Sequence, residues 1–60
     1  MKYTKQEVMD LVGAESEEQF NETFAGKTKE QVLESLVYMF GRDGKDETLA
    51  EEIVIYANEN

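Results

Sequence analysis

Apolar residues recur every three or four positions along most of the chain, which is the spacing of one face of an α-helix. The broadest apolar arc is in residues 29–40, where it comprises Val32, Leu33, Leu36, Met39 and Phe40. Proline is absent, so glycine is the residue type that separates the apolar stretches. The separating glycines are Gly13, Gly26, Gly41 and Gly44. This pattern predicts several short helices joined by turns.

Three of the stretches begin with the same motif, a hydroxyl residue followed three positions later by Glu or Gln. The pairs are Thr4 with Glu7, Ser16 with Gln19, and Thr28 with Gln31. In such a capping box each side chain accepts a hydrogen bond from the other residue's backbone N–H, which stabilises the first helical turn. We expect helices at about 5–12, 17–25 and 29–40. Each would end at a glycine in the left-handed conformation, at Gly13, Gly26 and Gly41.

The C-terminal stretch has features of both a strand and a helix. Residues 53–56 have strand propensity. Helical spacing, however, is shown by Leu49, Ile53, Tyr56 and Ala57, and no other stretch offers a strand partner. We therefore expect a fourth helix, capped by Asp46 or by Thr48, that ends at about Ala57.

The predicted fold is all-α: one small domain over residues 1–60, with four short helices in a compact bundle around a central third helix. The residues expected to cover the third helix are Val8, Leu11, Val12, Phe20, Phe24, Leu49, Ile53 and Tyr56. Two apolar residues, Tyr38 and Ile55, lie instead on the polar sides of their helices. They are either isolated surface residues or contacts for a partner or a second copy, and both interpretations stay open.

The charge of the chain narrows the choice of partners. Fourteen acidic and six basic residues give a net charge of -8, which opposes binding to nucleic acids and to anionic membranes. Residues 15–26 contain four acids and no base, namely Glu15, Glu17, Glu18 and Glu22. Residues 48–60 add a net -3, which includes Glu51 and Glu52. These carboxylates form either a solvated surface that keeps the protein soluble or a recognition surface.

The residue types present exclude most catalytic chemistry. Without Cys or His, the chain has no disulfide, no thiolate metal centre and no histidine-dependent nucleophile. We expect no cofactor, no metal site and no enzymatic activity, because a chain of this size can hardly build a deep pocket around its carboxylates. The longest apolar run, residues 36–40, is too short to span a bilayer. The first residues lack the apolar stretch of a secretory signal, so we expect a cytoplasmic protein.

The leading functional hypothesis is a small acidic binding protein that inhibits or regulates another protein. Its acidic helices would dock on a basic site of nucleic-acid-handling machinery, because carboxylates one helical turn apart can imitate a row of DNA phosphates. By analogy, viruses and mobile elements often encode such inhibitors. The expected binding residues are Glu15, Glu17, Glu18, Glu22, Glu51, Glu52, Tyr38 and Ile55.

Two alternatives stay open. A structural or regulatory homodimer would use Tyr38 and Ile55 as an apolar seam. A helix-turn-helix-like DNA-binding regulator would use residues 4–24, in which two predicted helices flank the turn at Gly13. The second alternative is the weaker one, because the helix that would enter the major groove contains three glutamates and no Lys or Arg.

Overall fold

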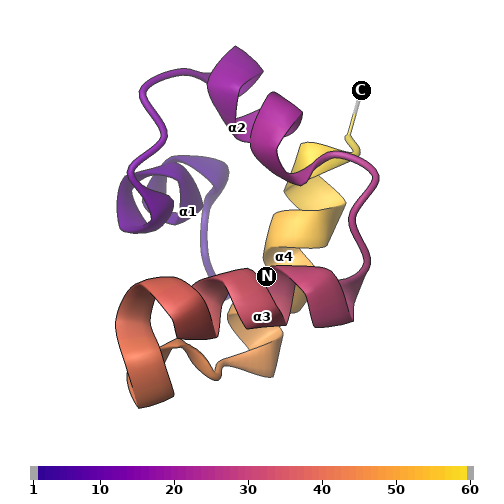
Figure 1. Cartoon of the computed structure of the whole chain (residues 1–60). Helices are drawn as coiled ribbons and strands as arrows, with labels where there is room; N and C mark the ends of the chain where they lie inside the picture. The colour runs from indigo at the N-terminus through magenta and orange to yellow at the C-terminus, as the bar shows by residue number, and fades with distance from the viewer. Residues whose placement is uncertain (1, 60) are drawn as a thin grey trace.

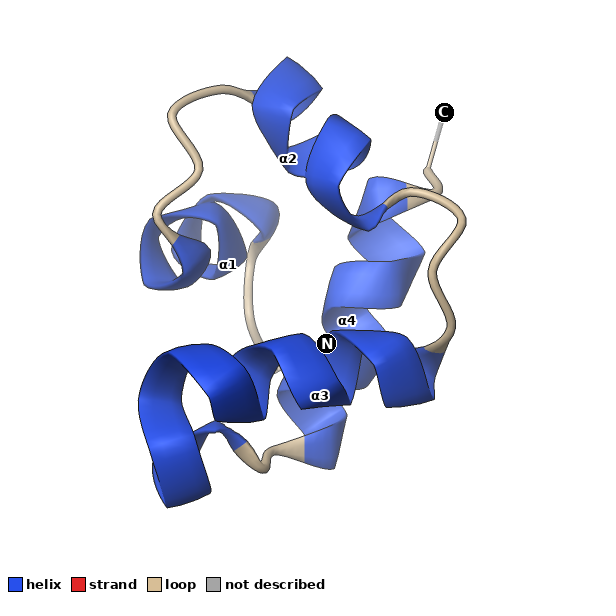
Figure 2. Ribbon diagram, viewed as in Figure 1, coloured by secondary structure: helices blue, strands red, loops and turns tan. Residues whose placement is uncertain are grey.

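The computed structural model of the chain describes residues 2–59. It contains helices α1 (Lys5–Val12), α2 (Glu17–Phe24), α3 (Lys29–Phe40) and α4 (Glu47–Ala57), with a 3-10 turn, η1 (Gly41–Gly44), between the last two. Figure 2 shows helices and loops only over these residues. The predicted all-α fold is therefore confirmed, and residues 53–56 are helical.

Side-chain caps begin all four helices, although one cap differs from the prediction. The boxes at Thr4 and Thr28 are complete, with both reciprocal hydrogen bonds present. Ser16 accepts from the Gln19 N–H, but the Gln19 side chain accepts from the Glu15 N–H instead of that of Ser16. Asp46 caps α4 by accepting from the Leu49 N–H at 3.1 Å.

The glycine ends of the helices follow the prediction only in part. Gly13 adopts the left-handed conformation, with φ 74° and ψ 25°. Gly41 has a positive φ of 68° but a ψ of -143°, so it is outside the left-handed helical region. The chain continues from there into η1 instead of stopping in a simple turn. The second helix ends at Phe24, and Gly26, with φ 79°, lies in the following turn.

Helices α3 and α4 form the main packed pair of the bundle. In Figure 1, α3 crosses in front of α4, and α1 and α2 lie on the same side of α3. Helix α3 with η1 makes the most extensive contacts, as predicted for the third helix. Helices α1 and α2 both pack against α4, which thus contacts all three other helices.

Gly44 allows η1 to fold back against α3. A Cβ atom at this position would overlap the Leu36 carbonyl oxygen and lie 2.9 Å from the Val37 nitrogen. Such distances are far below van der Waals contact, so only glycine fits between the two backbones without a shift. This close approach sets the direction in which the chain enters α4.

The core contains residues from all four helices, and its composition corrects part of the prediction. Its fully or nearly fully buried apolar members are Val8, Met9, Phe20, Phe24, Val32, Leu36, Leu49, Ala50, Ile53 and Ala57. Leu11, Met39 and Phe40 were expected in the core, but they are between 42% and 46% exposed. The last turn of α3 lies at the edge of the bundle (Figure 1), where η1 is the element packed closely against it.

Candidate functional site

The acidic face of α2 consists of Glu18 and Glu22 on the helix and Glu15 just before it. All three residues are exposed. Across residues 2–59, none of their carboxylates forms an ion pair. Glu18 and Glu22 are one helical turn apart, where like charges repel by a few tenths of a kcal/mol. This face therefore presents uncompensated negative charge to solvent.

Glu17, in the same predicted set, has a local partner. The Lys5 ammonium lies 2.8 Å from its Oε1 and links the first turns of α1 and α2. The hydrogen bond from Lys5, with the positive charge of that ammonium, lowers the pKa of the fully exposed Glu17 carboxyl below its ordinary value. Glu17 is therefore partly neutralised, although it is exposed.

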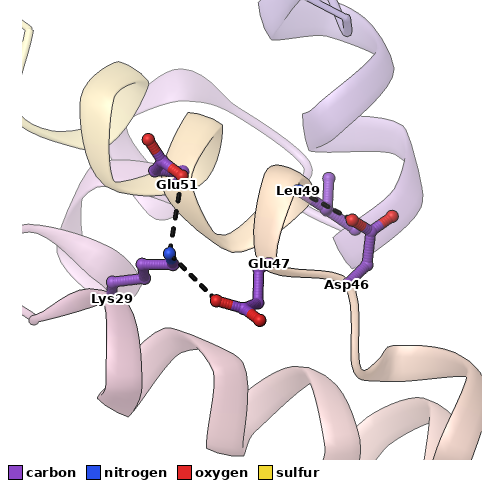
Figure 3. Close-up of polar contacts among 5 residues, drawn as sticks. All are labelled: Lys29, Asp46, Glu47, Leu49 and Glu51. Carbon is purple, nitrogen blue, oxygen red and sulfur yellow. Dashed lines mark hydrogen bonds and ion pairs between the residues drawn. The ribbon is translucent and has the colours of Figure 1, made fainter.

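Glu51 also faces a lysine, at the contact between α3 and α4. Lys29 Nζ lies 3.2 Å from Glu47 Oε1 and 3.5 Å from Glu51 Oε2 (Figure 3). The hydrogen bond to Glu47 is the main cause of a raised Lys29 pKa, which the charges of both carboxylates support and partial desolvation opposes. The two carboxylates therefore stabilise the junction of the two helices as well as contributing surface charge.

The structure corrects the position of Glu52, which was predicted to lie on the acidic surface. Glu52 is only 5% exposed. Its Oε2 accepts a hydrogen bond from the Lys2 N–H at 3.1 Å, and its Oε1 accepts one from the Tyr3 N–H at 2.8 Å. The carboxylate therefore holds the segment before α1 against α4.

Tyr3 completes this attachment with two further polar contacts to the last helix and its cap. Its carbonyl accepts a hydrogen bond from Tyr56 Oη at 2.6 Å, and its own Oη donates to Asp46 Oδ2 at 3.3 Å. The spacing of Glu52 three residues after Leu49 and four before Tyr56 could have indicated a core-facing position. No local pattern predicted its partners, which are about fifty positions away in the sequence.

The other candidate surface surrounds Tyr38, on the side of α3 that faces away from the core. Tyr38 is 91% exposed, and a shallow groove lies on each side of it. The groove toward η1 has a volume of about 650 Å³ and is lined by Glu30, Leu33, Glu34, Val37, Tyr38 and Lys45. The groove toward α2, of about 560 Å³, includes Phe24, Lys27 and Met39. We call Tyr38 and these two grooves the Tyr38 face.

Ile55, the second predicted apolar contact, is 46% exposed on α4. It lines neither of the grooves beside Tyr38. Because α3 and α4 pack against each other through their buried residues, Tyr38 and Ile55 lie on the outer faces of two different helices. The structure thus provides two separate exposed apolar positions.

Neither metal ligation nor similarity to known proteins points to a function for the described residues. Among residues 2–59 there is no group of three or more acidic side chains arranged to hold a metal ion. No helix in that range is long and apolar enough to cross a membrane. Comparisons with protein-family models, with characterised proteins and with solved structures find no match for this chain.

Proposed function

We propose that this chain is a small non-enzymatic protein that docks the acidic face of α2 on a basic, nucleic-acid-binding site of a partner protein. The observation that carries the proposal is the exposure of Glu15, Glu18 and Glu22 without an ion pair anywhere in residues 2–59. The same chain pairs Glu17, Glu47 and Glu51 with lysines. Three carboxylates, two on α2 and one just before it, are thus left free where a cationic surface can approach them.

The physical basis of the proposal is the resemblance between a row of carboxylates and a row of phosphates. Carboxylates one helical turn apart on α2 have Cβ atoms about 5–6 Å apart. A DNA strand carries one negative charge about every 3.4 Å along its axis, so a site that binds it is lined with Lys and Arg. A rigid helix can offer such a site several negative charges without the entropy loss of ordering a flexible segment.

The buried position of Glu52 removes it from the proposed interface. Glu17 and Glu51 retain a secondary role at the margin, because the lysines beside them offset part of their charge. Direct DNA binding through α2 is disfavoured by the same charges that support docking on a basic protein.

The test compares two pairs of glutamates that are matched in spacing and charge. In the variant Glu18→Gln/Glu22→Gln, the net charge changes from -8 to about -6 and the proposed contact is removed. The control, Glu30→Gln/Glu34→Gln, makes the same change at the same spacing on the exposed side of α3. Because like charges at this spacing repel, the free energy of unfolding of the first variant should equal that of the wild type or exceed it by a few tenths of a kcal/mol.

Immobilised protein is used to capture proteins from extracts of the native cell, with duplex DNA as competitor. We expect the wild type and the control to retain nucleic-acid-binding proteins that excess DNA releases, and the α2 variant to lose them. Calorimetry with the purified partner should then give a loss of about 1–3 kcal/mol for the α2 variant. Equal retention of the same proteins by both variants, insensitive to DNA, would contradict the proposal.

A further inference from the structure

The Tyr38 face is electrically neutral within a strongly acidic chain. Its charged residues are Lys27, Glu30, Glu34 and Lys45, whose charges sum to zero. The rest of the chain contains four bases and twelve acids and therefore carries the whole net charge of -8. Two copies of the chain repel each other, and this repulsion is weakest in the orientation in which the two neutral faces meet.

The shape of this face is complementary to itself. A highly exposed tyrosine lies directly beside a groove that has Leu33 and Val37 on its wall. When two such faces meet about a twofold axis, each tyrosine lies against the groove of the other copy, because an isologous interface repeats every contact twice. An exposed aromatic residue next to an apolar groove is also the arrangement typical of interface anchors.

The charges of the same groove are complementary under the same symmetry. Glu34 lies one helical turn before Tyr38, and Lys45, which follows η1, lines the same groove. If Tyr38 occupies the groove of a second copy, Glu34 of the same helix approaches Lys45 of that copy. Because Lys45 lines this groove, its ammonium can also form a favourable cation–π contact with the incoming tyrosine ring.

We propose that this chain forms a homodimer through the Tyr38 face, with each Tyr38 in the groove formed by Leu33, Val37 and Lys45 of the other copy. Ile55 is outside this interface, which distinguishes it from a seam that contains both residues. The acidic face of α2 is on another element and stays free for a partner, so the dimer does not depend on the proposed function.

The dimer contact and the docking of the acidic face on a partner respond to salt in opposite directions. Two chains of net charge -8 repel over long distances, so raising the ionic strength from about 0.02 M to about 0.5 M should strengthen the dimer by screening that repulsion. Docking of the acidic face on a basic partner should weaken over the same range. Failure of one interaction is thus visible independently of the other.

The experiment is sedimentation equilibrium of the whole chain from about 10 µM to about 1 mM. Tyr38→Ser should raise the dimer dissociation constant at least about tenfold, because it removes the central aromatic contact. Ile55→Ser, an equally polar change at the other exposed apolar position, should leave that constant within about twofold of the wild type. Circular dichroism checks that both variants retain their helices.

Charge reversal tests the geometry of the interface more closely. Lys45→Glu and Glu34→Lys should each weaken the dimer, and the double variant should recover most of the loss because the intermolecular pair is re-formed with reversed sign. Lys2→Glu has the same net charge as Lys45→Glu and lies outside the face, so it should weaken the dimer less. A monomer throughout the concentration range overturns the proposal. Equal weakening by Tyr38→Ser and Ile55→Ser also overturns it, in favour of a seam that includes α4.

Discussion

The two halves of this protein are held together by different means. In the C-terminal half, α3, η1 and α4 pack through apolar side chains and through the close backbone contact at Gly44. In the N-terminal half, α1 and α2 are eight residues long and each contributes two buried residues to the core. The segment before α1 is joined to α4 by the hydrogen bonds of Glu52 and Tyr56.

This difference between the halves affects which carboxylates have structural partners and which are free to bind another protein. In the C-terminal half Asp46 and Glu52 have structural partners, as a helix cap and as an acceptor for the backbone amides of Lys2 and Tyr3. In the N-terminal half the α2 carboxylates, apart from Glu17, are free. Isolated helices of eight residues are only marginally stable in water, so α1 and α2 depend on the other half for their order. Stability resides mainly in the C-terminal half, whereas Glu15, Glu18 and Glu22, the exposed acids of the predicted surface without an ion pair in residues 2–59, lie in the N-terminal half.

The largest expected effect comes from Leu36→Ala, which removes a fully buried side chain from α3. The change should lower the free energy of unfolding by about 2–5 kcal/mol, through lost burial and the cavity left behind. Leu11→Ala is the matched change in α1, at a half-exposed position, and should cost less than about 1 kcal/mol. Urea denaturation measures both, and equal losses would show that the two halves are packed equally well.

Gly44→Ala should have the next largest effect, because its Cβ atom would overlap the backbone of α3. We expect a loss of about 3 kcal/mol, at the upper end of overpacking costs. Gly26→Ala lies in the turn after α2, where a Cβ atom meets nothing within 4 Å and only the positive φ opposes it. That variant should lose about 1 kcal/mol. Thermal unfolding measures both variants. A larger loss of stability for Gly26→Ala than for Gly44→Ala would contradict the comparison.

Glu52→Gln tests the polar attachment of the N-terminal segment. An amide can accept at only one of the two positions now occupied by carboxylate oxygens, and its NH₂ group would face a backbone donor. We expect a loss of about 1–2 kcal/mol, with faster hydrogen exchange at the Tyr3 amide. Glu51→Gln, at the neighbouring exposed position, should cost less than about 0.5 kcal/mol. Unchanged exchange at Tyr3 would show that these hydrogen bonds do not hold the segment.

The smallest effect concerns the ion pair between α1 and α2. The folded-state pKa of Glu17 is lowered from its ordinary value of 4.5 by Lys5. The contribution of the pair is therefore present above that value and is lost as the pH falls through the lower folded-state pKa. Glu17→Gln should melt slightly below the wild type near neutral pH, and the two curves should converge in acid. Glu18→Gln is the unpaired control, and a wild-type advantage that grows on acidification would refute this assignment.

The local features of the fold could be predicted from the sequence, whereas parts of the site could not. The Thr4 and Thr28 caps and the segments of α1 and α3 follow from residues within four positions of one another. The exposed position of Tyr38 follows from helical periodicity in the same way. The exposure of Met39 and the hydrogen-bond partners of Glu52 could not be predicted, because each depends on which other segment lies opposite.

By itself, the sequence determined the number of helices, where the first three begin, and the concentration of acids in residues 15–26. These properties depend on capping, periodicity and composition, which act within one or two helical turns. Only the tertiary structure decided which amides Glu52 binds. It decided that, within the predicted acidic surface, Glu15, Glu18 and Glu22 are the exposed acids without an ion pair in residues 2–59. It also decided that Tyr38 lies between two grooves while Ile55 is on another helix. The physical reason is that burial and pairing arise from contacts between residues up to about fifty positions apart, whose positions follow from the packing of whole helices.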